Sequence, residues 1–130
     1  MPEHNYVYKI LPNTSPFQGI ANPVPASEII PRTQVDLDDG FIHLSTSTQL
    51  PNTLSRFFAS DDTVQLLKID YKRLSSFKTV KWEKASNGDT FPHLYGQLEG
   101  EFVRELKLVA KGGGWDDTCK ALEEEHFIED

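Results

Sequence analysis

The chain has 130 residues, of which 38% are hydrophobic, and its formal net charge is -7. This length fits one domain whose core is large enough to fold without a metal or a disulfide. The acidic balance argues against strong nucleic-acid binding, which depends on Lys and Arg side chains that displace counterions from phosphates. Cys119 is the single cysteine, which excludes an internal disulfide and a cysteine-rich zinc site and favours a reducing compartment.

No stretch of the sequence approaches the roughly 18–20 apolar residues of a membrane span. The N-terminal residues Met1–Asn5 also lack a basic segment followed by an apolar run. We therefore expect a soluble cytoplasmic protein without a membrane partner, and the sequence does not exclude the nucleus. The oligomeric state stays open.

The first half of the chain predicts a strand, a long irregular segment, a second strand and a helix. Aromatic and β-branched residues at Tyr6–Leu11 are typical of a strand. Repeated prolines in Ser15–Asp39 favour loops with a short helical turn. Gly40–Ser45 predicts a strand that leads into helix-capping residues. Apolar residues three or four positions apart then predict a helix from about Pro51 to Ala59.

The next part of the chain predicts further strands separated by turns. Val64–Ile69 is apolar enough for a buried strand, and Tyr71–Leu74 is predicted as a turn. Thr79–Glu83 alternates as a short strand does, and Asn87-Gly88 after it is a strong turn dipeptide. The mixture of aromatic, proline and glycine residues in Phe91–Gly96 suits either a structured loop or a short strand.

The C-terminal part predicts one more strand and a helix. Phe102–Val109 reads as the last strand, and Trp115–Phe127 has the spacing of a short amphipathic helix. Strands outnumber helices, which predicts a single α+β domain of two small, mainly antiparallel sheets with flanking helices. Its expected bounds are residues 1–110, with a Gly-rich joint and a C-terminal helical extension over residues 111–130.

His43 is the first candidate site residue. Alternate residues of a strand face opposite sides, so His43 lies opposite its apolar neighbours Ile42 and Leu44, and Ser45 shares its face. A histidine and a hydroxyl side by side offer donors and acceptors that fit the edge of a sugar or an amide. The alternative is a structural histidine that bonds a backbone carbonyl.

His93 and Tyr95 repeat the same spacing and would project together from an extended segment. Tyr95 offers a flat face for stacking a planar ring, and the alternative is a core tyrosine. Glu83 directly follows the aromatic Trp82 on a predicted strand. It could act as an acid, a base or an anchor for a ribose hydroxyl, or lie at the surface without a function.

Several familiar site types are absent from the sequence. Neither a Gly-x-Gly-x-x-Gly motif after a predicted strand nor a Gly-x-x-x-x-Gly-Lys-Ser/Thr loop occurs, and these are the two common glycine-rich motifs that bind phosphates. A metal site built from His43, His93 and Glu83 lacks any supporting local spacing, so no metal is expected. Cys119 as a nucleophile is disfavoured, because the surrounding acidic residues oppose a thiolate.

Four segments together resemble the domain-of-unknown-function 952 family, and the resemblance spans roughly Tyr6–Val109. The segments that carry it are Asp39–Thr46, Gln49–Phe58, Lys81–Glu83 and Phe91–Gly96. The resemblance implies an ADP-ribosyltransferase-like fold, whose cleft binds NAD in the enzymes. In that larger group a strand histidine and a hydroxyl two residues later contact the NAD ribose and the nicotinamide amide, and here His43 and Ser45 match them. Tyr95 matches by character the tyrosine that stacks on nicotinamide.

The sequence departs from that group at the catalytic glutamate, because no Glu-x-Glu lies on the last predicted strand. Glu83, Glu101 and Glu105 stay open as alternatives. The expected cofactor is NAD or a nucleotide-like ligand, with His43, Ser45, His93 and Tyr95 as binding residues and with His43 and Glu83 as catalytic residues.

Two classes of function follow from these residues. The first is a transferase that cleaves the nicotinamide–ribose bond of NAD. RNA 2′-phosphate transfer is a variant of it, although the charge of -7 weighs against an RNA substrate. The second is a non-enzymatic module that binds a small ligand or a protein segment in the same cleft. Fold alone does not decide between them.

Overall fold

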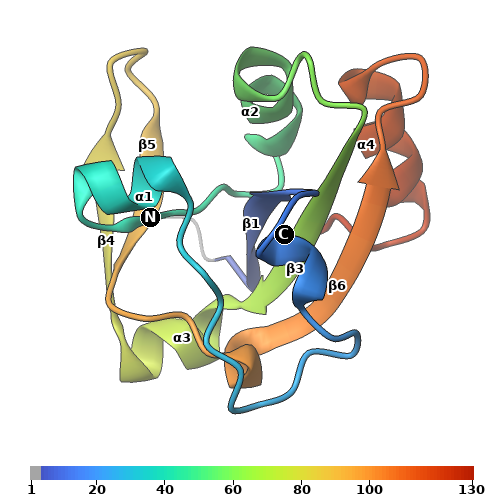
Figure 1. Ribbon diagram of the computed structural model, residues 1–130. Coiled ribbons are helices and arrows are strands. Elements are labelled where there is room, and N and C mark those ends of the chain that lie inside the picture. Colours follow the sequence, from blue (N-terminus) through green and yellow to red (C-terminus); the bar gives the residue numbers. More distant parts are fainter. Residues whose placement is uncertain (1–3) are drawn as a thin grey trace.

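Two three-stranded antiparallel sheets frame the molecule, as the computed structural model shows for residues 4–130 (Figure 1). The first sheet has the order β1-β3-β6, with strands β1 (Tyr6–Pro12), β3 (Thr63–Asp70) and β6 (Val103–Ala110). The second has the order β2-β5-β4, with strands β2 (Ile42–His43), β5 (Thr90–Tyr95) and β4 (Thr79–Lys84). The predicted α+β architecture of two antiparallel sheets with flanking helices is confirmed.

Four α-helices flank these sheets within residues 4–130. They are α1 (Gln34–Asp39), α2 (Leu50–Phe57), α3 (Tyr71–Phe77) and α4 (Trp115–Glu124), and single 3₁₀ turns lie at Phe17–Gly19 and Gly100–Phe102. Figure 1 shows α1 beside β4 and β5 at the left, α2 at the top centre and α4 at the right. None of these helices in the described residues combines the length and the apolar character needed to cross a membrane.

The first sheet is buried on both faces, which decides where a site can lie. Val7 on one face belongs to a cluster that includes Ile42 and Leu94 of the second sheet. Tyr8 on the other face belongs to a cluster built from α2, α4 and the C-terminal residues. Because the second sheet turns its apolar side chains toward the first, its opposite face is free to carry polar groups.

The C-terminal segment is part of the packing of the first sheet. Trp115, Cys119 and Leu122 of α4 are buried, as the predicted amphipathic helix requires. Phe127 and Ile128 join the same cluster. Burial, with Glu123 and Asp116 nearby, raises the pKa of the Cys119 thiol to about 11, so this cysteine is a core residue with little thiolate at neutral pH.

Two local predictions differ from the structure. Tyr71–Leu74 was predicted as a turn but begins α3, because the Asp70 carboxylate caps the helix by accepting the Arg73 N–H at 3.1 Å and Leu74 is fully buried. The strand predicted over Gly40–Ser45 shortens to two residues. Gly40 instead ends α1 in the left-handed conformation, with φ of 80°.

Candidate functional site

The open face of the second sheet brings the two predicted histidines together. In the antiparallel register His43 of β2 lies directly opposite His93 of β5, and Lys81 of β4 lies opposite His93 on its other side. Directly opposed residues project from the same face of a sheet. The imidazole ring centroids of His43 and His93 are 5.4 Å apart.

Glu83 and Tyr95 complete a hydrogen-bonded group around His93. One carboxylate oxygen of Glu83, Oε1, lies 2.8 Å from His93 Nδ1 and accepts the Tyr95 hydroxyl at 2.6 Å. The hydrogen bond from Tyr95, and to a smaller extent the one from His93, holds the pKa of the Glu83 carboxyl below its usual range. The bond to Glu83 in turn raises the pKa of Tyr95. Glu83 is therefore an ionised carboxylate at neutral pH.

The buried ion pair of Lys9 and Asp36 holds His43 in position. Asp36 is fully buried, and its carboxylate lies 2.8 Å from Lys9 Nζ and 2.8 Å from His43 Nδ1. It also accepts the His43 backbone N–H at 3.0 Å. Burial opposes ionisation of Asp36, but the bonds from His43 and the charge of Lys9 outweigh it and hold the pKa of this carboxyl well below its usual range.

The second nitrogen of His43 faces another carboxylate. His43 Nε2 lies 2.9 Å from an oxygen of Asp39, whose side chain is 49% exposed. Only a doubly protonated imidazole can donate to Asp36 and Asp39 at the same time. An exposed pair of this kind contributes about 0–1 kcal/mol, so a ligand can displace Asp39, whereas the buried contact to Asp36 stays in place.

Phe41 packs across this group and was not singled out as a site residue from the sequence. Its ring centroid is 4.0 Å from that of His93, 4.5 Å from that of His43 and 5.4 Å from that of Tyr95. The available signal was its position two residues before His43, which places both on one face of an extended segment. We call Phe41, His43, Glu83, His93 and Tyr95 the histidine site.

The family described as Protein of unknown function (DUF952) has a model that matches residues 21–106, a range that contains the whole histidine site. The chain belongs to the DUF952 family. The chain is 28% identical in sequence to protein CC0527 from Caulobacter crescentus, whose crystal structure matches it with a TM-score of 0.71 over 88% of this chain and 98% of that chain.

Two further structures of CC0527 agree with this likeness. A crystal structure of a double mutant is 27% identical, with a TM-score of 0.70 over 88% of this chain and 98% of that one. The solution NMR structure is 28% identical, with a TM-score of 0.70 over 97% of this chain and 100% of that one. Among curated proteins no sequence matches this chain.

Ser45 occupies a different environment from the histidine site of this DUF952 chain. It is 5% exposed, and its backbone N–H and C=O bond Tyr8 of the first sheet at 2.9 and 2.8 Å. Within residues 4–130 no hydrogen bond joins its side chain to the histidine site. Ser45 thus ties the end of β2 to β1.

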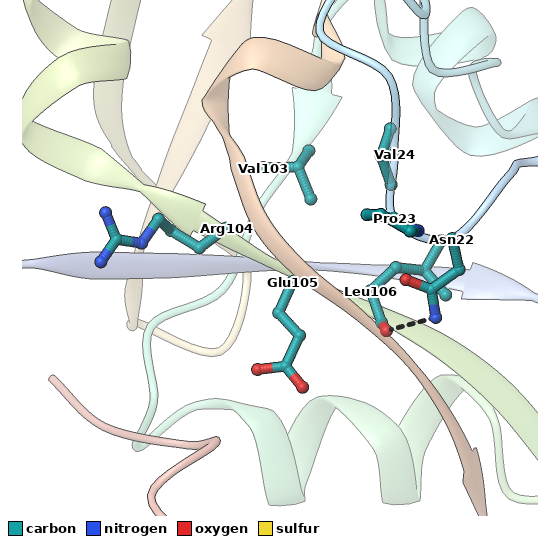
Figure 2. Close-up of a pocket in the computed structure, with 7 residues that line it drawn as sticks. All are labelled: Asn22, Pro23, Val24, Val103, Arg104, Glu105 and Leu106. Atoms are coloured by element: carbon teal, nitrogen blue, oxygen red, sulfur yellow. Dashed lines mark hydrogen bonds between the residues drawn. The ribbon is translucent and has the colours of Figure 1, made fainter.

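The three glutamates that the sequence left open are separated by the fold. Glu101 lies 2.8 Å from the guanidinium of Arg73. Glu105 lines a separate cavity of about 120 Å³ beside β6, where Asn22 donates to the Leu106 carbonyl at 3.1 Å (Figure 2). Of the three, Glu83 alone bonds a residue of the histidine site.

Several polar atoms of the histidine site already have hydrogen-bond partners. Among residues 4–130 no group of three or more His, Cys, Asp and Glu side chains is arranged to hold a metal ion. Glu83 Oε1 is already occupied by two hydrogen bonds, and both nitrogens of His43 face carboxylates. Glu83, His93 and Tyr95 are joined by hydrogen bonds.

Proposed function

We propose that this DUF952 protein binds NAD or a related nucleotide at the histidine site, on an ADP-ribosyltransferase-like arrangement of its sheets, and cleaves the nicotinamide–ribose bond. One observation carries the proposal. Of the three candidate glutamates, only Glu83 bonds His93, which lies directly opposite His43. An ionised carboxylate beside two imidazoles and a tyrosine can stabilise the positive charge that develops on a ribose when its bond to nicotinamide breaks.

The proposal gives Glu83 two tasks through its two oxygens. Oε1 accepts from His93 and Tyr95, whereas no hydrogen bond among the described residues involves Oε2, and the side chain is 40% exposed. Oε2 can therefore accept a ribose hydroxyl. Its negative charge also stabilises the oxocarbenium-like transition state, as carboxylates do in glycoside hydrolysis.

His43 and Tyr95 hold the ligand in this proposal. His43 Nε2 exchanges Asp39 for an oxygen of the ribose or of the nicotinamide amide. The Tyr95 ring stacks the planar base after Lys81, whose ammonium lies 4.8 Å from the ring centroid, moves aside. Ser45 supports the strand without touching the ligand.

NAD titration tests the binding step. NAD at 100 times its dissociation constant should add about 2.7 kcal/mol of stability and raise the Tm by about 10 °C. His43→Ala and Glu83→Gln should lose most of that shift. His126→Asn changes an exposed histidine outside the site and should keep it. A wild-type protein whose Tm does not respond to NAD and that consumes none would refute the proposal.

Asp39→Ala tests whether this carboxylate competes with the ligand. Removing it frees His43 Nε2, so NAD should bind up to about fivefold more tightly, as expected from an exposed pair worth at most about 1 kcal/mol. Asp38→Ala removes an equal charge from the same helix, where Asp38 accepts from Gln34 at 2.9 Å instead. Isothermal titration of both variants makes the comparison. Equal gains in the two variants would mean that charge alone acts.

A non-enzymatic binding module is the second candidate. It is favoured by the hydrogen bonds within the site, because both nitrogens of His43 and the hydroxyl of Tyr95 have protein partners. A site held in one arrangement by such hydrogen bonds can bind a ligand without breaking any bond in it. NAD that binds but is recovered intact after long incubation would support this function.

A further inference from the structure

His93 differs from His43 in having one ring nitrogen free. Its Nδ1 faces Glu83 at 2.8 Å, and no hydrogen bond among residues 4–130 involves its Nε2. This nitrogen is not fully buried. His43, in contrast, has a carboxylate at each nitrogen.

The surroundings of His93 fix both its orientation and its tautomer. Phe41 stacks on the ring at 4.0 Å with an angle of 25° between the planes, and only 11% of the side chain is exposed. Because the Glu83 carboxylate can only accept, Nδ1 carries a proton, and in the neutral ring Nε2 carries the lone pair. A carboxylate that orients a histidine in this way is the arrangement of a general base.

We propose that His93 is the general base of the transfer reaction, an inference that rests on the proposed cleavage of NAD. Nε2 takes the proton of an acceptor hydroxyl or of water while that oxygen forms a bond to C1′ of the ribose. The bond between C1′ and the nicotinamide nitrogen breaks, and its electron pair leaves with neutral nicotinamide. The positive charge of NAD thereby ends on the His93 imidazolium, next to Glu83.

Glu83 is then a positioning residue for His93 as well as a ribose contact. It holds the reactive tautomer and stabilises the imidazolium that forms. The charged and titratable groups that face His93 are Glu83 and Lys81 of β4, His43 of β2 and Tyr95 of its own strand. Lys81 is exposed, so Glu83 is the dominant charge at the ring.

His93→Asn separates the base from the hydrogen bond. The asparagine amide can still donate toward Glu83, but it supplies no basic nitrogen. The rate of NAD consumption should fall about a hundredfold to ten-thousandfold, the usual contribution of a general base. The dissociation constant for NAD, measured by titration, should stay within about threefold. His126→Asn should consume NAD at the wild-type rate.

Nitrogen NMR of the unliganded protein provides a readout that does not need turnover. The ring nitrogens of His93 should show the Nδ1-protonated tautomer in the wild type at mildly alkaline pH. Glu83→Gln should shift this ring toward the Nε2-protonated form, because the substitution removes the carboxylate that accepts the Nδ1 proton.

The possible failures are distinct. Absence of NAD binding refutes the proposed function, and the catalytic role of His93 with it. NAD binding without consumption leaves the binding proposal standing and overturns the general base. Consumption that survives His93→Asn at the wild-type rate, or a wild-type His93 found in the Nε2-protonated tautomer, also overturns it.

Discussion

Asp36→Asn is expected to lower the free energy of unfolding by about 3–5 kcal/mol, because it leaves the Lys9 ammonium buried without its counter-charge. Lys9 is 4% exposed, and its other hydrogen bond goes to the backbone carbonyl of His43 at 3.1 Å. The same substitution weakens the contact that orients the His43 ring. Urea unfolding at neutral pH measures the loss.

Two further variants define what that loss means. Asp38→Asn removes an exposed carboxylate from the same helix and should change stability by less than about 0.5 kcal/mol. Combining Asp36→Asn with Lys9→Met removes the unpaired charge and should recover part of the loss. A double variant as unstable as the sum of its single variants would show that the ion pair itself contributes nothing.

The stability gap between the wild type and Asp36→Asn should also depend on pH in a defined direction. The folded protein holds the pKa of the Asp36 carboxyl well below the value of about 3.9 that an unfolded chain shows. Its ionised form therefore stabilises the fold fully above that value. As pH falls below about 4, this contribution is lost and the gap between the two proteins narrows.

Strand periodicity predicted the faces of His43 and His93, but not which strands meet. The alternation around His43 and His93 assigned each to the polar side of its own strand. The turn at Asn87-Gly88 lies between β4 and β5, and their register places Lys81 opposite His93. The pairing of β2 with β5 joins segments 50 residues apart, and nothing local specifies it.

Asp36 and Lys9, which hold His43 in position, could not be predicted from the sequence for a different reason. Asp36 lies in a segment whose prolines predicted loops with a short helical turn, and Thr33 and Asp36 form the capping box that begins α1. The capping pattern accounts for the helix start. It carries no information about Lys9, 27 residues earlier, whose buried ammonium donates to the same carboxylate. Which buried charges pair depends on how distant segments pack together, and no local sequence pattern specifies it.

Gly100 shows how the fold holds the proline-rich segment in place without any side chain. A Cβ atom built on Gly100 would lie 1.9 Å from the Pro25 carbonyl oxygen and 2.9 Å from a methyl group of Val24. The Gly100 N–H also donates to the Glu28 carbonyl at 2.7 Å. The backbones of the two segments therefore touch at a point where only glycine fits.

Gly100→Ala should accordingly destabilise the protein by about 3 kcal/mol or more, because the nearest obstructing atom, the Pro25 carbonyl oxygen, belongs to backbone and cannot rotate away. Gly19→Ala is the matched control, since a Cβ at Gly19 meets nothing within 4 Å. It should change the free energy of unfolding by no more than about 1 kcal/mol. Thermal and urea unfolding of both variants measure the difference. Equal stability of the two would mean that the Pro25 segment moves away at little cost.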